Sequence, residues 1–155
     1  MNIDSESLYI SGVAALNIKC GDLNVTGDWH RLSINWNKLK LSDMNKSHFG
    51  DWGIERNIWI PELESYYNVA NVLRACIDMI DSANWYGVFG MHDDYIGNDL
   101  YNDIIFSKVL YMRSWKTERE WNSIHSFMIK EYRLSWIRFL YSPLTPATGL
   151  EPTPR

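Results

Sequence analysis

The sequence predicts an α+β fold, with a small β-containing N-terminal part packed on three long C-terminal helices. Up to about Glu62, short apolar stretches are separated by turn signals that contain glycine. After Pro61, apolar residues recur at the three- and four-residue spacing of helices, and no Gly or Pro interrupts residues 98–142. We therefore predict a single α+β domain over residues 1–141, followed by a disordered proline-rich tail at 142–155.

Three short strands are expected in the N-terminal part. Alternation of apolar and polar residues with period two predicts half-buried strands at 23–25 and 32–36. Residues 58–60 give a third strand, which Pro61 ends. For residues 8–19 the sequence does not decide between two kinds of secondary structure, because the apolar run fits a short helix as well as a buried strand.

The first predicted helix follows Pro61 and reaches about Ile80. Proline favours the first helical position, and Glu62 and Glu64 suit the positive end of the helix dipole. Apolar residues from Leu63 onward then trace one face. The Gly-containing stretch 87–90 predicts a short strand or a tight turn.

Two further helices are expected in the Gly- and Pro-free region. Asp99 is placed to cap the first, with Leu100 on its apolar face. Thr117 and Glu120 have the spacing of a capping box, which predicts the start of the second. Its apolar pattern predicts an unbroken helix to about Leu140.

Composition describes a globular protein. The chain has 155 residues, 46% of them hydrophobic and 22% charged, and no apolar run approaches the about 20 residues of a membrane helix. The first residues lack the pattern of a secretory signal. Cys20 and Cys76 lack metal or disulfide spacing. We expect a cytoplasmic protein with no membrane segment and no cofactor.

Negative charge is concentrated in one segment. The net charge is −4, and the residues between Arg74 and Lys108 include six acids but no Lys or Arg. Only the last helix offers basic residues beside aromatic ones, so the sequence disfavours a nucleic-acid partner. An acidic patch edged by aromatic residues fits a basic groove on another protein. The predicted partner-binding residues of this segment are Asp93, Asp94, Asp99, Asp103, Tyr95 and Tyr101.

Two tryptophans lie in near-copies of one phrase, Thr26–His30 and Gly50–Glu55. Gly-Asp-Trp on a tight turn presents Trp29 and Trp52 as binding anchors, or folds their rings back into the core. Both are included among the predicted partner-binding residues, and the core alternative stays open.

Histidines beside aspartates suggest an alternative function. A metal-dependent hydrolase or nuclease would use His30, His48 and His92 with Asp51 and Asp93. These residues lack the helical spacing of a metal motif, and Asp after Gly commonly orders a turn. The chain also shows no nucleophile–base pair and no phosphate loop. A non-catalytic binding protein is therefore the favoured interpretation.

Several phrases together carry a family resemblance: Leu8–Ile18, Thr26–His30, Asp51–Glu55, Asn68–Asp78, Gly90–Phe106 and Phe127–Tyr132. They resemble small bacterial proteins associated with nucleotidyltransferase-type abortive-infection toxins. The resemblance covers about residues 8–139 and rests on the order of the phrases. It implies an antitoxin-like partner of a basic toxin encoded by a neighbouring gene, in a toxin–antitoxin or phage-defence unit.

Deleting residues 142–155 is expected to leave the melting temperature unchanged. Four of the five prolines lie there, and its two leucines could each contribute at most about 1.5–3 kcal/mol. Ordering the segment costs about 1–2 kcal/mol per residue. Thermal unfolding of the full and shortened chains checks this. A drop of more than about 4 °C would mean that the tail packs on the domain.

Overall fold

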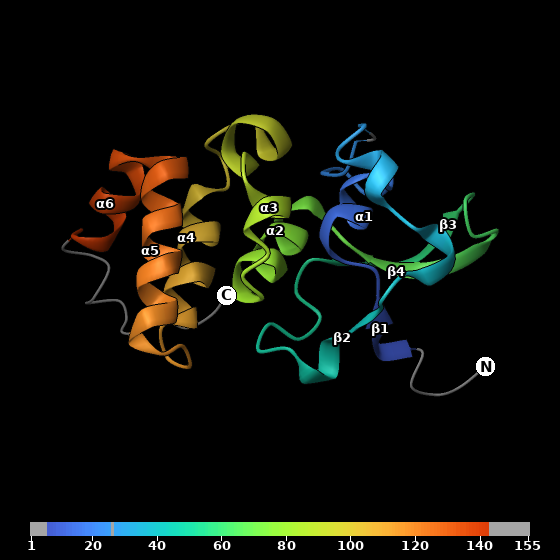
Figure 1. Ribbon diagram of the computed structural model, residues 1–155, viewed down its shortest axis with the longest axis horizontal. Coiled ribbons are helices and arrows are strands. Elements are labelled where there is room, and N and C mark those ends of the chain that lie inside the picture. Colours follow the sequence, from blue (N-terminus) through green and yellow to red (C-terminus); the bar gives the residue numbers. More distant parts are fainter. Residues whose placement is uncertain (1–5, 26, 143–155) are drawn as a thin grey trace. The chain divides into compact units, whose positions relative to one another are not determined.

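The computed structural model describes residues 6–25 and 27–142 (Figure 1). Strand pairs lie in the N-terminal half and helices dominate the C-terminal half, which confirms the α+β class. The chain divides into two compact units, one of residues up to Met79 with Tyr86–Val88, the other of Ile80–Trp85 and residues from Phe89 on. The single domain over residues 1–141 stays a prediction. The proline-rich tail after Ser142 lies outside the described residues.

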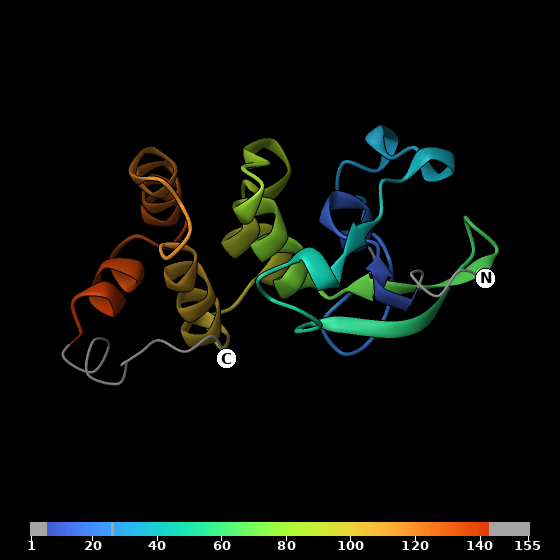
Figure 2. The same cartoon turned by 90° about the horizontal axis from the view of Figure 1, so that it is seen from below.

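The first unit holds two antiparallel strand pairs, of which the longer is drawn in green in Figures 1 and 2. The strands are β1 (Leu8–Tyr9) with β2 (Ser42–Asp43), and β3 (Ile54–Ile60) with β4 (Ser65–Ala70). The chain after β1 also joins β4, because the Ile10 N–H donates to the Asn68 carbonyl at 2.9 Å and the Ala70 N–H donates to the Ile10 carbonyl at 2.9 Å. Ile10, Val69 and Ala70 are buried in the core there.

The helices of the N-terminal half are short. They are α1 (Gly12–Leu16), η2 (Arg31–Ser33), η3 (Trp36–Lys38) and η4 (Met44–Lys46), followed after the strands by α2 (Val72–Asp81). Residues 8–19, for which both a helix and a strand were considered, therefore contain one of each. The strand predicted at 32–36 is wrong: the side chain of Asn35 accepts the Asn37 N–H at 3.1 Å, which starts a helical turn instead.

The strand predicted at 23–25 is also wrong, because the alternation there is inverted. Val25 is 72% exposed, whereas Asn24 is buried. The Asn24 amide donates to the Ala70 carbonyl at 3.3 Å, and its oxygen accepts the Val72 N–H at the start of α2. A polar side chain that satisfies buried backbone groups thus takes the place expected for an apolar one.

The helix predicted from Pro61 is wrong over its first half. Residues 61–64 form the turn of the β3–β4 hairpin, with the Leu63 N–H donating to the Ile60 carbonyl at 3.0 Å, and α2 begins only at Val72. Tyrosines in β4 favour strands, and Tyr66 lies directly opposite Trp59 with ring centroids 5.1 Å apart. The contact between β3 and β4 therefore selects a strand where the apolar spacing alone favoured a helix.

A fully buried arginine connects three parts of the first unit. Arg74 on α2 donates from Nε to Asp78, from Nη1 to the carbonyls of Gly50 and Trp52, and from Nη2 to Tyr9 and Ser47. All five N–H groups of its guanidinium therefore have acceptors. The Arg74 guanidinium also lies 5.1 Å from the centre of the Tyr9 ring.

Asp78 completes this network as the acceptor. Its carboxylate accepts from the Arg74 Nε at 2.8 Å, the Tyr9 hydroxyl at 2.6 Å and the Ser11 hydroxyl at 2.7 Å. Burial, and then the neighbouring Asp78 charge, raise the pKa of Tyr9 well above its usual value. Tyr9 therefore remains a hydrogen-bond donor to Asp78 at any physiological pH.

The C-terminal half contains the longer helices. They are α3 (Trp85–Val88), the π-helical turn η5 (Met91–Ile96), α4 (Asn102–Met112), α5 (Glu118–Tyr132) and α6 (Leu134–Leu140). The stretch 87–90, expected as a strand or a tight turn, ends α3 and then turns at Gly90, which has φ 89°. Among the described residues, no helix is long and apolar enough to cross a membrane.

The capping box at Thr117 and Glu120 is confirmed, but the helix does not run unbroken to Leu140. It breaks at Arg133, which has φ 53°. The Trp136 indole N–H donates to His125 Nδ1 at 2.9 Å, whereas eleven residues of straight helix would separate them by about 16 Å. The break lets Trp136 become fully buried beside Phe106, with ring centroids 5.5 Å apart.

Arg74→Met is expected to lower the free energy of unfolding by about 3–5 kcal/mol, because it leaves the partly buried Asp78 carboxylate without its cation and the carbonyls of Gly50 and Trp52 without their donor. Urea unfolding of the variant checks this. Arg31→Met is the matched control: Arg31 pairs with Glu62 at 3.0 Å, but its side chain is 42% exposed, so the loss should stay below about 1 kcal/mol. Equal losses for the two variants would contradict the role assigned to Arg74.

Candidate functional site

The four predicted aspartates of the acidic segment lie on one surface stretch of the second unit. Asp93 and Asp94 belong to η5, Asp99 lies in the turn that follows, and Asp103 lies in the first turn of α4. All four side chains are exposed. A π-helical turn is rare and is frequently found at functional sites, so this stretch, the acidic loop 91–103, is the first candidate.

Glycines set the path of the loop at both ends of η5. Gly90 and Gly97 have φ 89° and 75°, a conformation that other residues rarely adopt. The Asp94 N–H donates to the Gly90 carbonyl at 2.7 Å, and a side chain at position 90 would meet the Asp94 carboxylate. The position of Asp94 therefore depends on glycine at 90.

Glu131 on α5 anchors the start of the loop. Its carboxylate accepts the backbone N–H groups of Gly90 at 3.0 Å and His92 at 3.2 Å. Charged acceptors make the stronger class of hydrogen bond. Sequence reasoning missed Glu131, because a single glutamate about forty residues further along the chain gives no local signal.

His92 links the backbone of the loop to two of its carboxylates. Its ring nitrogens lie 2.8 Å from Asp99 Oδ1 and 3.1 Å from Asp93 Oδ1, and its ring centre lies 4.7 Å from that of Tyr132. The hydrogen bond with His92 holds the pKa of Asp99 below its usual value. Asp99 is therefore ionised at neutral pH, and it remains on the surface.

An exposed leucine accompanies these carboxylates. Leu100 was expected on the apolar face of a helix capped by Asp99, but α4 begins only at Asn102 and Leu100 is 83% exposed. The Leu100 N–H donates to the side chain of Asn98 at 2.9 Å in a local turn, and Asp99 bonds His92 instead of capping. The predicted aromatic residues Tyr95 and Tyr101 are half-buried.

Trp29 and Trp52 lie in the first unit, and both are half-buried. The backbone of Trp29 exchanges hydrogen bonds with the side chain of Asn17, at 2.8 and 3.1 Å. The Trp52 carbonyl accepts from Arg74, and its ring centroid lies 6.4 Å from that of Phe49. Both phrases thus supply backbone groups to buried polar side chains, and partner binding by these tryptophans stays a prediction.

The predicted metal ligands are divided between the units. His30, which packs its ring 5.0 Å from Tyr86, lies in the first unit with His48 and Asp51, whereas His92 and Asp93 lie in the second. Within 6–25 and 27–142, no group of three or more His, Cys, Asp or Glu residues is placed to hold a metal ion. The described part of the chain therefore offers no ligand set for the alternative hydrolase or nuclease.

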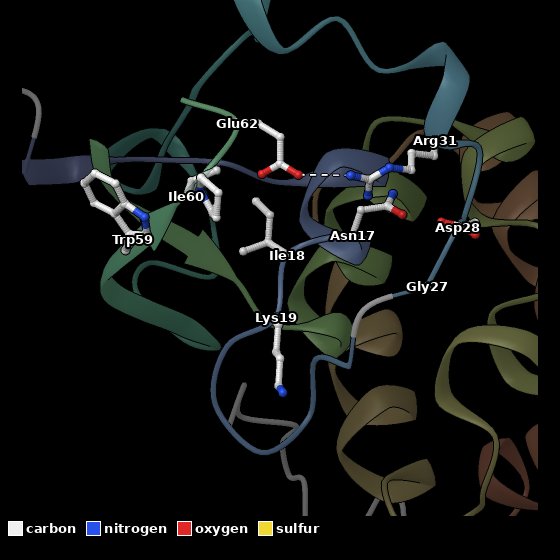
Figure 3. Close-up of a pocket in the computed structure, with 10 residues that line it drawn as sticks. Asn17, Ile18, Lys19, Gly27, Asp28, Arg31, Trp59, Ile60 and Glu62 are labelled. Atoms are coloured by element: carbon white, nitrogen blue, oxygen red, sulfur yellow. Dashed lines mark hydrogen bonds and ion pairs between the residues drawn. The ribbon is translucent and has the colours of Figure 1, made fainter. Parts of the chain in front are cut away.

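A cavity of about 630 Å³ opens in the first unit beside the hairpin turn. Figure 3 shows Arg31 and Glu62 facing one another there, with Lys19 directed away from them. Trp59 and Asp28 also line this cavity. The lining contains positively and negatively charged side chains, and two of these, Arg31 and Glu62, pair with one another. The charge of the lining therefore favours no class of ligand.

Comparisons with protein-family models, with curated proteins and with solved structures find no match to this chain.

Glu131→Gln is expected to loosen the acidic loop 91–103. A carboxamide keeps one acceptor oxygen in place of two, so the Gly90 and His92 amides should exchange hydrogen about ten- to a hundred-fold faster, as expected for lost bonds to a charged group. Hydrogen exchange followed by NMR measures this. Glu118→Gln, on the exposed first turn of α5, should leave both rates unchanged, and similar rates in the two variants would contradict the anchoring role.

Proposed function

We propose that this chain is a non-catalytic protein-binding module that uses the acidic loop 91–103 to dock on a basic surface of a partner protein. The observation that carries the proposal is four exposed carboxylates on a loop whose backbone is held by Glu131. Among the described residues, no Lys or Arg pairs with any of the four. Their charge is therefore available to attract a partner.

The arrangement of the loop suits binding for an entropic reason. Glu131 and His92 bond the loop before any partner arrives, and Gly90 and Gly97 allow the backbone turns at both ends of η5. Binding then costs less conformational entropy than it would for a flexible acidic segment. Two of the six acidic residues between Arg74 and Lys108 do not belong to this surface, because Asp78 bonds Arg74 and Asp81 bonds Lys116 at 2.9 Å.

Leu100 adds an apolar contact to the charged surface. Protein interfaces commonly place apolar residues at the centre and charged residues at the rim. With Leu100 exposed between Asp99 and Asp103, the loop offers such an arrangement on a small scale. A basic groove with an apolar floor is the complementary surface.

The family resemblance supports a more specific partner. We propose an antitoxin-like role, in which the loop binds a basic nucleotidyltransferase-type toxin encoded by a neighbouring gene and thereby restrains it. This part of the proposal rests on the order of the sequence phrases, and the charge on the loop is compatible with it. No catalytic step is assigned to this chain.

Replacing both Asp93 and Asp94 with Lys is expected to slow association with the neighbouring gene's product by about ten-fold or more at low salt. Surface plasmon resonance with the tagged chain measures the rate. The difference between the variant and the unchanged chain should shrink as salt rises, because exposed charges are screened over about 8 Å at physiological ionic strength.

Asp22→Lys with Glu64→Lys is the matched control, since both residues are exposed in the first unit and the net charge changes equally. It should leave the association rate close to that of the unchanged chain. Equal slowing by both double variants would show that net charge, and not the acidic loop, is responsible. If no neighbouring product binds the unchanged chain, the antitoxin-like role is wrong.

A further inference from the structure

A second surface of the second unit has the opposite electrostatic character. A groove of about 630 Å³ lies beside α5, and its lining contains two cations and no carboxylate. Trp85, Phe89 and Phe127 supply the aromatic part, and small polar side chains of α5 supply most of the rest. We call this surface the α5 groove. The sequence shows basic residues beside aromatic ones in its last helix; the structure shows that Arg119 and Lys130 line the same groove as three aromatic side chains.

The aromatic residues offer flat surfaces to a ligand. Trp85 and Phe127 pack against one another with ring centroids 5.1 Å apart and an angle of 36° between their planes. Phe127 is buried, Trp85 is half-buried, and Phe89 is 70% exposed. The pair gives the groove a rigid aromatic floor, while Phe89 remains accessible at its side.

The two cations stand on one face of α5. Arg119 and Lys130 are separated by just over three helical turns, so they lie nearly in line, about 16 Å apart along the axis. Among the described residues, neither has an ion-pair partner. The neighbouring Glu120 forms no ion pair with Arg119 among the described residues; its side chain accepts the Thr117 N–H at 2.9 Å in the capping box.

This combination narrows the class of ligand. Cations alone would accept any polyanion, and aromatic rings alone would accept any apolar group. Proteins that bind single-stranded nucleic acid use both together, with cations along the backbone and aromatic rings under the bases. An acidic peptide would use the cations but would have no general need for exposed aromatic faces. A duplex would keep its bases stacked on one another and away from Phe89.

We propose that the α5 groove binds a short single strand of nucleic acid. Arg119 and Lys130 contact its phosphates, and its bases stack on Phe89 and Trp85. Bases stacked at about 3.4 Å per nucleotide would place about five nucleotides between the two cations. This inference does not depend on the acidic loop or on a toxin partner, because none of the four exposed aspartates lines the groove.

The test is fluorescence anisotropy with a labelled oligothymidylate of about eight nucleotides and the full chain. Titrations at several salt concentrations between about 50 and 200 mM give the slope of log K against log salt. Each neutralised phosphate contributes about −0.7 for a single strand, so two contacts predict a slope of about −1.4. Tryptophan fluorescence should be quenched in parallel, as a base stacks on Trp85.

Two kinds of variant separate charge from stacking. Arg119→Gln and Lys130→Gln should each reduce the steepness of the slope by about 0.7 and weaken binding by about ten-fold at 50 mM salt. Phe89→Ala should weaken binding by about five-fold or more, as expected for one lost stacking contact, without changing the slope. Because Phe89 is largely exposed, this variant should fold, which circular dichroism checks.

Arg138→Gln provides the matched control, since Arg138 is exposed on α6 outside the groove lining; it should bind like the unchanged chain. The proposal is overturned if the groove variants also bind like the unchanged chain, or if a duplex of the same length binds as tightly. Displacement of the strand by an equal concentration of polyglutamate would overturn it too, because that result identifies an acidic-peptide site. Failure here leaves the partner-binding proposal intact, since Asp93 and Asp94 are unchanged throughout.

Discussion

The burial of one guanidinium is the constraint on which the first unit depends. Taking a charge out of water costs several kcal/mol, even after relaxation, so Arg74 is tolerable only where every donor finds an acceptor. Those acceptors come from β1, from residues 47–52 and from α2 itself. One side chain thereby fixes a strand, a loop and a helix against one another. Arg74 also explains why Asp78, which the sequence places in an acidic segment, makes no contribution to the acidic surface.

The same constraint explains the repeated Gly-Asp-Trp phrase. In its second copy, the carbonyls of Gly50 and Trp52 point at Arg74, and the turn needs glycine, with φ 55°, at position 50. In its first copy, the backbone of Trp29 bonds the buried side chain of Asn17. The repeat therefore reflects one structural problem solved twice, namely how a surface turn satisfies a buried polar side chain.

Local signals predicted what local energies decide. The capping box at Thr117 depends on residues only three positions apart, so the sequence predicted it correctly. The hairpin at Pro61 was not predicted, because the apolar residues after it have helical spacing. Only contact with β3 selects a strand there. The break at Arg133 is likewise set by a distant partner, since Trp136 must reach His125. For the candidate site, the count of aspartates predicted the charge, but the exposure of Leu100 and the anchor at Glu131 required the tertiary structure.

The acidic loop and the α5 groove are close neighbours along the chain, and this follows from helical geometry. Consecutive residues of a helix point about 100° apart, so Lys130 lines the groove while Glu131 holds the loop. Phe89 lines the groove, and the next residue, Gly90, donates the first bond to Glu131. A nucleic-acid strand stacked on Phe89 and a protein bound to the acidic loop would therefore contact parts of the chain that are joined at Phe89 and Gly90. Any coupling between two such ligands must be reciprocal in binding free energy, and the peptide bonds that join Phe89 to Gly90 and Lys130 to Glu131 connect the two sites directly.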